Sequence, residues 1–321
     1  MRDAQAVPIR PDVRDGADRP AGLAREVDES YTVDQRFAQY RDVYPGIAWP
    51  AVTWREGQSV LFDRPYKTLA ARTLHLDIFG PATANGQGIV LVHGGAWRSG
   101  AKTHFYALAN LLAQRGYTVF LPEFRLSVEA PYPAGMEDVA DALAWAKSHA
   151  GEFGISADRI ALGGASSGGQ MAALLAYAGP GGLYGETRKT RPNALIDLDG
   201  VLDMADPEAL RFENAAGPDS PFARWLGGSF EAMPQRWREA SAASHVGPQS
   251  PPTLIVGSGI ARFTVGKDRV IAALDRNHVA HREFAFTGAP HDFWLFDPWL
   301  SRTAGEIDIF LRRLAPAESP K

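Results

Sequence analysis

The chain has 321 residues with 33 basic and 37 acidic side chains, a formal net charge of −4 and 45% hydrophobic residues. This is the composition of a globular protein with a sizeable core, and the well-mixed charges argue against a nucleic-acid partner. The absence of cysteine excludes disulfide bonds, cysteine-ligated zinc and a thiol nucleophile.

Two segments precede the main body of the chain. Residues 1–30 are rich in Arg, Asp, Ala and Pro, and we expect a disordered leader there. They lack the apolar core of a signal peptide, and no stretch of the chain approaches the roughly 18 apolar residues of a membrane span. Residues 31–60 mix aromatic side chains with prolines and are interpreted as an N-terminal wrap that packs on the domain. The compartment stays open between the cytoplasm and, if a signal peptide was removed, the periplasm or exterior.

Residues 61–315, the predicted catalytic domain, alternate between short apolar runs and segments with helical spacing. Strands are predicted at 74–78, 88–92, 117–121, 160–162, 194–198, 253–256 and 282–286, and helices at 103–116, 136–150, 170–177, 265–274 and 304–314. This order predicts an α/β fold with a mostly parallel central sheet and helices on both faces. Residues 203–250 interrupt the rhythm with Pro, Gly and Trp, so we expect a helical cap or lid insertion over the active site.

The segment Gly164-Ala165-Ser166-Ser167-Gly168 fits the pattern G-x-S-x-G between a predicted strand and a predicted helix. This is the layout of a nucleophile elbow, in which a strained turn lifts the serine hydroxyl clear of the sheet. Ser166 is therefore the candidate nucleophile, and the backbone N–H of Ser167 is placed to donate to an oxyanion. The alternative is a glycine- and serine-rich turn without a catalytic role. The motifs described next help to decide between these two interpretations.

The segment His93-Gly94-Gly95-Ala96-Trp97 directly follows the predicted strand at 88–92. A glycine turn in this position lets the N–H groups of Gly94 and Gly95 point at a developing oxyanion, together with that of Ser167. The stretch also has some likeness to a phosphate-binding loop, but the required Gly-Lys-Ser/Thr is absent. A plain strand-to-helix turn is the remaining alternative.

His291 lies in a loop after the last predicted strand, where it completes the chain order Ser…acid…His. An imidazole in this place can take the proton of the serine hydroxyl. The acid is expected soon after the strand at 253–256, yet the first carboxylate beyond it is Asp268, at the start of a predicted helix. Asp268 is the first choice, with a helix-capping role as its alternative, and Asp199 and Asp203 are the other candidates.

Together these motifs resemble the α/β-hydrolase fold over roughly residues 55–315. The His-Gly-Gly turn and residues 124–134 resemble the hormone-sensitive-lipase-like esterases. Residues 261–268 and 291–299 look closer to bacterial carbohydrate esterases of the acetyl-xylan and pectin acetylesterase type.

The resemblance implies catalytic roles for Ser166 and His291. It also implies an oxyanion hole built from the backbone N–H groups of Gly94, Gly95 and Ser167. The sequence departs from the lipase-like pattern at Ala96, which stands where a third glycine is usual, and it lacks the usual acid-loop pattern after the strand at 253–256.

The sequence therefore predicts a serine hydrolase of carboxylic esters that works through an acyl-enzyme, and most specifically a carbohydrate acetylesterase acting on a polysaccharide or oligosaccharide. The alternatives are a general short-chain carboxylesterase or lipase, a peptidase of the prolyl-oligopeptidase kind and a non-catalytic binding module. Trp97 and Trp294 are candidates to stack on a sugar ring, with core or rim packing as the alternative. Arg98 or Arg262 is a candidate to bind a uronate carboxylate, with a solvated surface charge as the alternative. No metal-ligand spacing occurs in the sequence, so neither a metal nor a cofactor is expected.

Overall fold

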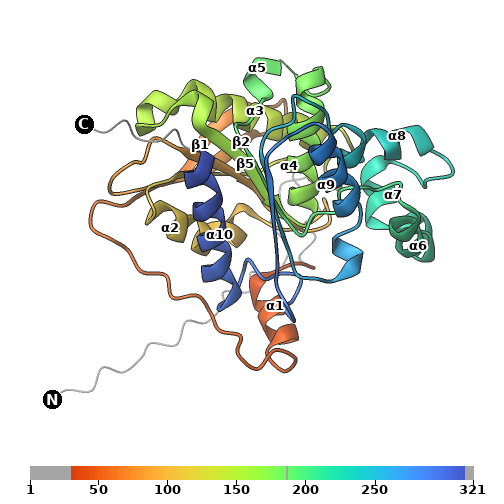
Figure 1. Ribbon diagram of the computed structural model, residues 1–321, viewed down its shortest axis with the longest axis horizontal. Helices are drawn as coiled ribbons and strands as arrows, with labels where there is room; N and C mark the ends of the chain where they lie inside the picture. The colour runs from red at the N-terminus through yellow and green to blue at the C-terminus, as the bar shows by residue number, and fades with distance from the viewer. Residues whose placement is uncertain (1–29, 186, 315–321) are drawn as a thin grey trace, which may run out of the picture.

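An eight-stranded sheet forms the centre of the computed structural model, which describes residues 30–185 and 187–314 (Figure 1). The strands are β1 (Ser59–Thr68), β2 (Thr73–Gly80), β3 (Gly88–Val92), β4 (Thr118–Pro122), β5 (Ile160–Ala165), β6 (Leu195–Leu198), β7 (Thr253–Gly257) and β8 (His281–Ala285). Their order across the sheet is β1-β2-β4-β3-β5-β6-β7-β8. Strand β2 pairs antiparallel with β1 and β4, and the other neighbours are parallel. The predicted, mostly parallel α/β sheet is confirmed.

Ten α-helices connect or flank the strands in the described part of the chain. They are α1 (Val33–Tyr40), α2 (Tyr106–Ala113), α3 (Ala134–Ser148), α4 (Ser167–Ala178), α5 (Thr187–Thr190), α6 (Pro207–Ala216), α7 (Pro221–Leu226), α8 (Pro234–Glu239), α9 (Lys267–Arg276) and α10 (Trp299–Leu314). Across the described residues, no helix combines the length and the apolar character needed to cross a membrane.

The helices cover both faces of the sheet, and each face has its own apolar core. Helices α3, α4 and α9 pack with one set of strand side chains, which includes Val90 and Val92. Helices α2 and α10 pack with the other set, which includes Ile89 and Leu91. Because alternate side chains of a strand point to opposite faces, a strand covered on both faces is apolar throughout. All five residues of β3 are accordingly buried.

The N-terminal part of the described chain contains two elements that the sequence did not predict, α1 and β1. The residues of β1 show no regular alternation in burial. Eight of its ten positions are exposed or carry polar, charged or proline side chains, as suits a strand at the edge of the sheet. Residues 31–58 run over the outside of the domain, and several of their large apolar side chains are exposed, including Trp49 and Trp54. The predicted leader lies outside the described residues except for Ser30.

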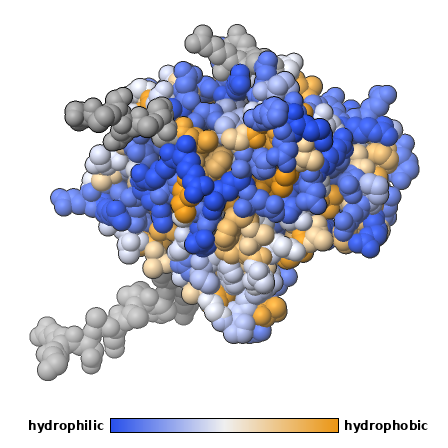
Figure 2. All heavy atoms as spheres, viewed as in Figure 1, coloured by the Kyte–Doolittle hydropathy of each residue, from blue (hydrophilic) through white to orange (hydrophobic). Residues whose placement is uncertain are grey.

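Helices α6, α7 and α8 lie within the segment between β6 and β7, where the sequence indicated a helical insertion. In Figure 1 they gather at one end of the molecule, next to α9. Figure 2 shows the same view as a surface, on which hydrophilic residues predominate and apolar residues form smaller patches between them. The insertion therefore lies on the side of the sheet at which β5, β6 and β7 end.

Candidate active site

The turn between β5 and α4 holds Ser166 in a backbone conformation that few non-glycine residues adopt. Its φ is 53° and its ψ is −124°, between the last residue of β5 and the first of α4. The turn requires glycine on both sides. A Cβ added at Gly168 would overlap the carbonyl oxygen of Val92, and one added at Gly164 would overlap the carbonyl oxygen of Gly168. The G-x-S-x-G pattern is thus explained by the close approach of strand and helix.

Ser166, His291 and Asp199 form a continuous line of hydrogen bonds. The Nε2 atom of His291 lies 2.9 Å from Oγ of Ser166, and its Nδ1 atom lies 2.7 Å from Oδ2 of Asp199. With the ring proton on Nδ1, the imidazole donates to the carboxylate and accepts from the serine hydroxyl. The carboxylate of Asp199 is fully buried, whereas the ring of His291 is 12% exposed. This arrangement can remove the serine proton and stabilise the imidazolium that results.

The residue beside His291 is Asp199, and the expectation that Asp268 lies there is wrong. Asp268 is in the first turn of α9 with its side chain 96% exposed, and it forms an ion pair with Lys267 at 3.8 Å. Asp203, the remaining candidate, is buried and pairs with Arg269. Asp199 follows β6 directly, so the acid comes from one strand earlier than the sequence pattern suggested.

Ser258 occupies the position after β7 where the acid was expected. Its backbone N–H donates to Oδ1 of Asp199 at 2.9 Å, and its hydroxyl donates to Oδ2 at 2.6 Å. Together with the Nδ1–H of His291, these donors satisfy a carboxylate that has no access to solvent. Asp199 itself adopts a φ of 55°, which turns its side chain towards His291.

Burial shifts the pKa of two titratable groups near this line towards their uncharged forms. Burial lowers the pKa of His93 to about 3, although its Nδ1 lies 2.8 Å from the carbonyl oxygen of Gly94. Burial and the charge of Asp199 raise the pKa of Asp197 well above its ordinary value, against a hydrogen bond from the N–H of Gly200. In both groups burial thus disfavours a charge that would compete with the Asp199–His291 pair.

The expected oxyanion residues lie around Ser166. A Cβ added at Gly94 would lie 3.0 Å from Cβ of Ser166, so these two backbones are adjacent. Gly95 follows with a φ of 126°, and its carbonyl accepts from the N–H and the hydroxyl of Ser99. Ser167 begins α4, and the first N–H groups of a helix have no partner within it. The turn and the helix start thus converge on the serine hydroxyl, with Ser167 lying on the cavity wall.

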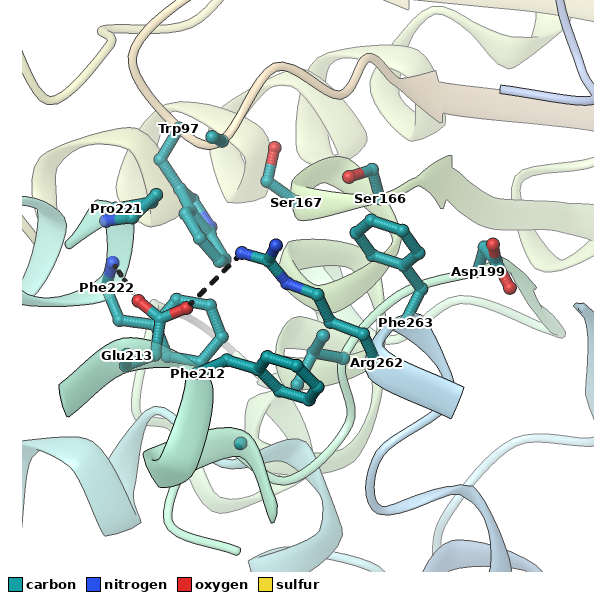
Figure 3. A pocket seen from close by; sticks show the side chains of 13 residues that line it. Trp97, Ser166, Ser167, Asp199, Phe212, Glu213, Pro221, Phe222, Arg262 and Phe263 are labelled. Atoms are coloured by element: carbon teal, nitrogen blue, oxygen red, sulfur yellow. Dashed lines mark hydrogen bonds and ion pairs between the residues drawn. The ribbon is translucent and has the colours of Figure 1, made fainter. Parts of the chain in front are cut away.

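A cavity of about 80 Å³ opens beside Ser166 (Figure 3). One wall comes from the turn after β3, with Ala96 and Trp97. The insertion supplies Ala209, Phe212, Glu213, Pro221 and Phe222, and the segment after β7 supplies Arg262 and Phe263. Most of these side chains are apolar, so the cavity suits a small apolar group attached to a reacting centre at Ser166.

The four residues expected to bind the substrate do not all lie at the cavity. Arg262 lines the cavity, and Arg98 is not among the lining residues. Trp97 also lines it but is 96% buried, stacked on Trp225 and bonded through Nε1 to Gln170. Trp294 is 1% exposed and packs edge-on against His291, so the expectation that it stacks on a sugar is wrong.

Three residues at the site were not singled out by the sequence. Phe263 stacks on the ring of His291 with a centroid distance of 3.5 Å and an interplanar angle of 13°. Glu213 is a buried carboxylate in the cavity wall, and Ser258 supports Asp199. The segment 261–268, which carries Phe263, was noted only for its resemblance to carbohydrate esterases. In the described ranges, no group of three or more metal-ligating side chains could hold a metal ion.

Comparison with curated proteins finds esterases. LipC, an esterase of Mycobacterium tuberculosis (strain ATCC 25618 / H37Rv), is 28% identical over 240 residues, which cover 70% of this chain and 58% of LipC. An arylesterase of Saccharolobus solfataricus is 35% identical over 102 residues, or 31% of this chain and 33% of the relative. The chain thus spans less than two thirds of the length of these curated relatives.

Solved structures share the fold. A truncated carbohydrate esterase from gut microbiota superposes with a TM-score of 0.65 at 20% identity, covering 83% of this chain and 99% of the other. An arylesterase superposes with a TM-score of 0.67 at 19% identity, covering 89% and 93% of the two chains. At such identities the likeness concerns the fold alone. With the strand order and the elbow after β5, it identifies the α/β-hydrolase fold.

The family model described as BD-FAE matches residues 76–261, a segment that begins in β2 and ends in the loop after β7. It includes the turn at Gly94, the elbow at Ser166 and the buried carboxylate of Asp199. Because this match covers more than half of its 321 residues, the chain belongs to the BD-FAE family.

Proposed function

We propose that the protein is a serine hydrolase of carboxylic esters, with Ser166 as nucleophile, His291 as general base and acid, and Asp199 as the carboxylate that orients His291. The observation that carries this proposal is the unbroken line of hydrogen bonds from Ser166 through His291 to Asp199, at 2.9 and 2.7 Å, beside a cavity. The names of the curated relatives, all esterases or lipases, support the same reaction class.

The reaction proceeds in two displacements. Oγ of Ser166 attacks the ester carbonyl carbon while Nε2 of His291 takes its proton. Backbone N–H groups of Gly94, Gly95 and Ser167 stabilise the oxyanion, and one such donor is worth roughly 2.7–4 kcal/mol in the transition state. The intermediate expels the alkoxide, which takes the proton from His291. Water then gives a proton to His291 and attacks the acyl-enzyme, and collapse of the second intermediate returns that proton to Ser166 and releases the acid.

Within this reaction class, we propose a short acyl group, and acetyl esters of carbohydrates as the substrates. The cavity measures about 80 Å³, whereas a cavity of roughly 150 Å³ is known to hold benzene, so an aromatic acyl group is disfavoured. A carbohydrate esterase is among the chains that share the fold. Arg262, whose side chain is 48% exposed, can donate to hydroxyl or carboxylate oxygens of the alcohol portion.

The test measures acetate release from acetylated xylan and acetylated pectin, beside hydrolysis of 4-nitrophenyl acetate, by the wild type and Ser166→Ala. Loss of at least about 10³-fold in all activities of Ser166→Ala is expected, because the nucleophile is removed. If the wild type hydrolyses 4-nitrophenyl acetate rapidly but releases acetate from neither polysaccharide, the result would favour a general short-chain carboxylesterase. A folded wild type that hydrolyses nothing and is not labelled by a fluorophosphonate would overturn the proposal in favour of a binding module.

A further inference from the structure

Glu213 of α6 lies between two cavities. One is the cavity of about 80 Å³ beside Ser166, and the other measures about 360 Å³. The second cavity lies within the insertion, and its lining includes Asn214, Ser220 and Trp237. Among the described residues, Glu213 is the single residue that lines both. Its side chain therefore forms part of the wall that separates them.

The carboxylate of Glu213 is held from several sides. Oε2 accepts a hydrogen bond from the backbone N–H of Phe222 at 3.2 Å, and the hydroxyl of Ser220 also donates to the carboxylate. Oε1 lies 4.0 Å from a terminal nitrogen of Arg262, which reaches over from the segment after β7 (Figure 3). The guanidinium of Arg262 in turn contacts the rings of Phe212 and Phe263. Only 4% of Glu213 is exposed, so these partners replace water around the carboxylate.

A hydrocarbon chain that entered from Ser166 would meet this carboxylate after crossing an apolar lining. To pass, it would have to displace the side chain and leave the N–H of Phe222 and the hydroxyl of Ser220 without their acceptor, which is unfavourable in a buried place. The wall is therefore selective by chemistry as well as by volume. Because the cavity measures only about 80 Å³, a short acyl group has room in front of Glu213, whereas a long alkyl chain would need the space beyond it.

We propose that Glu213 is a specificity-determining residue that closes the cavity beside Ser166 and restricts the acyl group of the substrate to a few carbons. This inference rests on the proposed ester hydrolysis at Ser166. It assigns the cavity to the acyl group because this group stays bound to Ser166 in the acyl-enzyme, while the alcohol must leave past His291. Removing the side chain of Glu213 joins the cavity to the second one and makes room for longer chains.

The test compares Glu213→Ala with Glu213→Gln on 4-nitrophenyl esters of acetate, butyrate, octanoate and decanoate. Glutamine keeps the volume and an acceptor for the N–H of Phe222, and so it is the matched control. In Glu213→Ala, the ratio of kcat/KM for octanoate to that for acetate is expected to rise at least tenfold, and in Glu213→Gln to stay within threefold of the wild type. An unchanged ratio in Glu213→Ala would overturn the proposal, and so would an equal rise in both variants, because the charge would then be responsible.

Two further measurements separate this inference from the proposed function. Hydrolysis of 4-nitrophenyl acetate that depends on Ser166 establishes the reaction independently of chain length, and its absence would overturn both. A series of alkyl acetates tests which portion of the ester occupies the cavity. If Glu213→Ala broadens the alcohol series and leaves the acyl series unchanged, the assignment to the acyl group is wrong. Should Glu213→Ala fail to fold, Glu213→Ser opens a similar gap with a small polar side chain, and the same ratios decide.

Discussion

The carboxylate of Asp199 receives hydrogen bonds from His291 and from both donors of Ser258, and none of its surface is exposed to water. Replacing it with asparagine puts an amide where the imidazole N–H must donate, which favours the wrong tautomer of His291. We expect Asp199→Asn to lower kcat roughly 10⁴-fold for 4-nitrophenyl acetate, with a folded protein. Steady-state kinetics and a thermal unfolding curve check this.

Asp268→Asn is the matched control for that substitution. The Asp268 side chain is almost entirely exposed, and its ion pair with Lys267 is of the kind that contributes little. Its kcat is expected to stay within about twofold of the wild type, in line with the near-neutral effect of exposed substitutions. Equal losses in both variants, or an active Asp199→Asn, would contradict the role proposed for Asp199.

Among single residues, the sequence predicted those that belong to a short motif of neighbouring residues. Ser166 needs a glycine on each side of its turn, so its pattern is visible in five consecutive residues. Asp199 has no such pattern, because its position depends on a φ of 55° and on Ser258, a residue 59 positions away. For Trp294 the sequence left sugar stacking and core packing open, and its burial against His291 depends on the packing of the loop, which composition does not reveal.

Among the elements, α1 makes contacts that bear directly on the loop of His291. Asp292, the next residue, is buried, and its two oxygens accept from the hydroxyls of Tyr31 at 2.6 Å and Tyr40 at 2.5 Å. Arg36 adds an ion pair at 3.7 Å. Burial, with the nearby charge of Asp292, raises the pKa of both tyrosines, so they remain protonated and donate. The N-terminal segment thus satisfies a charge beside the proposed base.

Removing both hydroxyls should therefore disturb His291. In a Tyr31→Phe/Tyr40→Phe variant, the carboxylate of Asp292 loses two donors, and a buried acceptor left unpaired costs about 1–3 kcal/mol. We expect a lower thermal unfolding temperature and a fall in kcat of roughly tenfold, with KM little changed because the cavity is untouched. Tyr44→Phe is the control, since Tyr44 packs against Tyr40 and Trp299. An equal fall in Tyr44→Phe, which keeps the ring and loses a hydroxyl that does not contact Asp292, would contradict a specific role for the two hydroxyls at Asp292.

Burial explains which helices and strands could be predicted from the sequence. Strands β3 and β5 are buried on both faces, so their apolar runs stood out in the sequence. Helix α1 has no fully buried residue, and its apolar stripe of Val33, Phe37 and Tyr40 covers only two turns, which is too short to stand out in the sequence. Strand β1 forms the edge of the sheet and contains Pro65, which a strand tolerates at an edge. Both depend on neighbours far away in the sequence.

For the whole molecule, the buried histidines set the response to acid. Burial lowers the pKa of His104 to about 4, below the ordinary value of 6.5. A lowered pKa in the folded state means that the unfolded chain binds the proton first. This contribution to stability is complete above about pH 6.5 and is lost as the pH falls towards 4.

His104→Phe should remove that part of the acid sensitivity. The ring fills the same place beside Tyr31, and the unpartnered Nδ1 disappears with it. Between pH 7 and pH 4.5, the wild type is expected to lose about 2 kcal/mol more of its unfolding free energy than the variant. Urea titrations at the two pH values measure the difference, with the exposed His278→Asn as control. Parallel losses in wild type and His104→Phe would contradict the assignment.

Because Asp199 completes the hydrogen-bond line from β6, the loop after β7 contributes Ser258 as a support and Phe263 as a stacking partner, but no carboxylate. This loop nevertheless supplies Arg262 and Phe263 to the cavity wall. The loop that lines the cavity is therefore separate from Asp199, the residue proposed to carry the charge that supports proton transfer. Directed evolution can randomise residues 259–262, or graft this loop from a relative, and every library member that retains Ser258 and Phe263 still carries the complete proton-transfer chain.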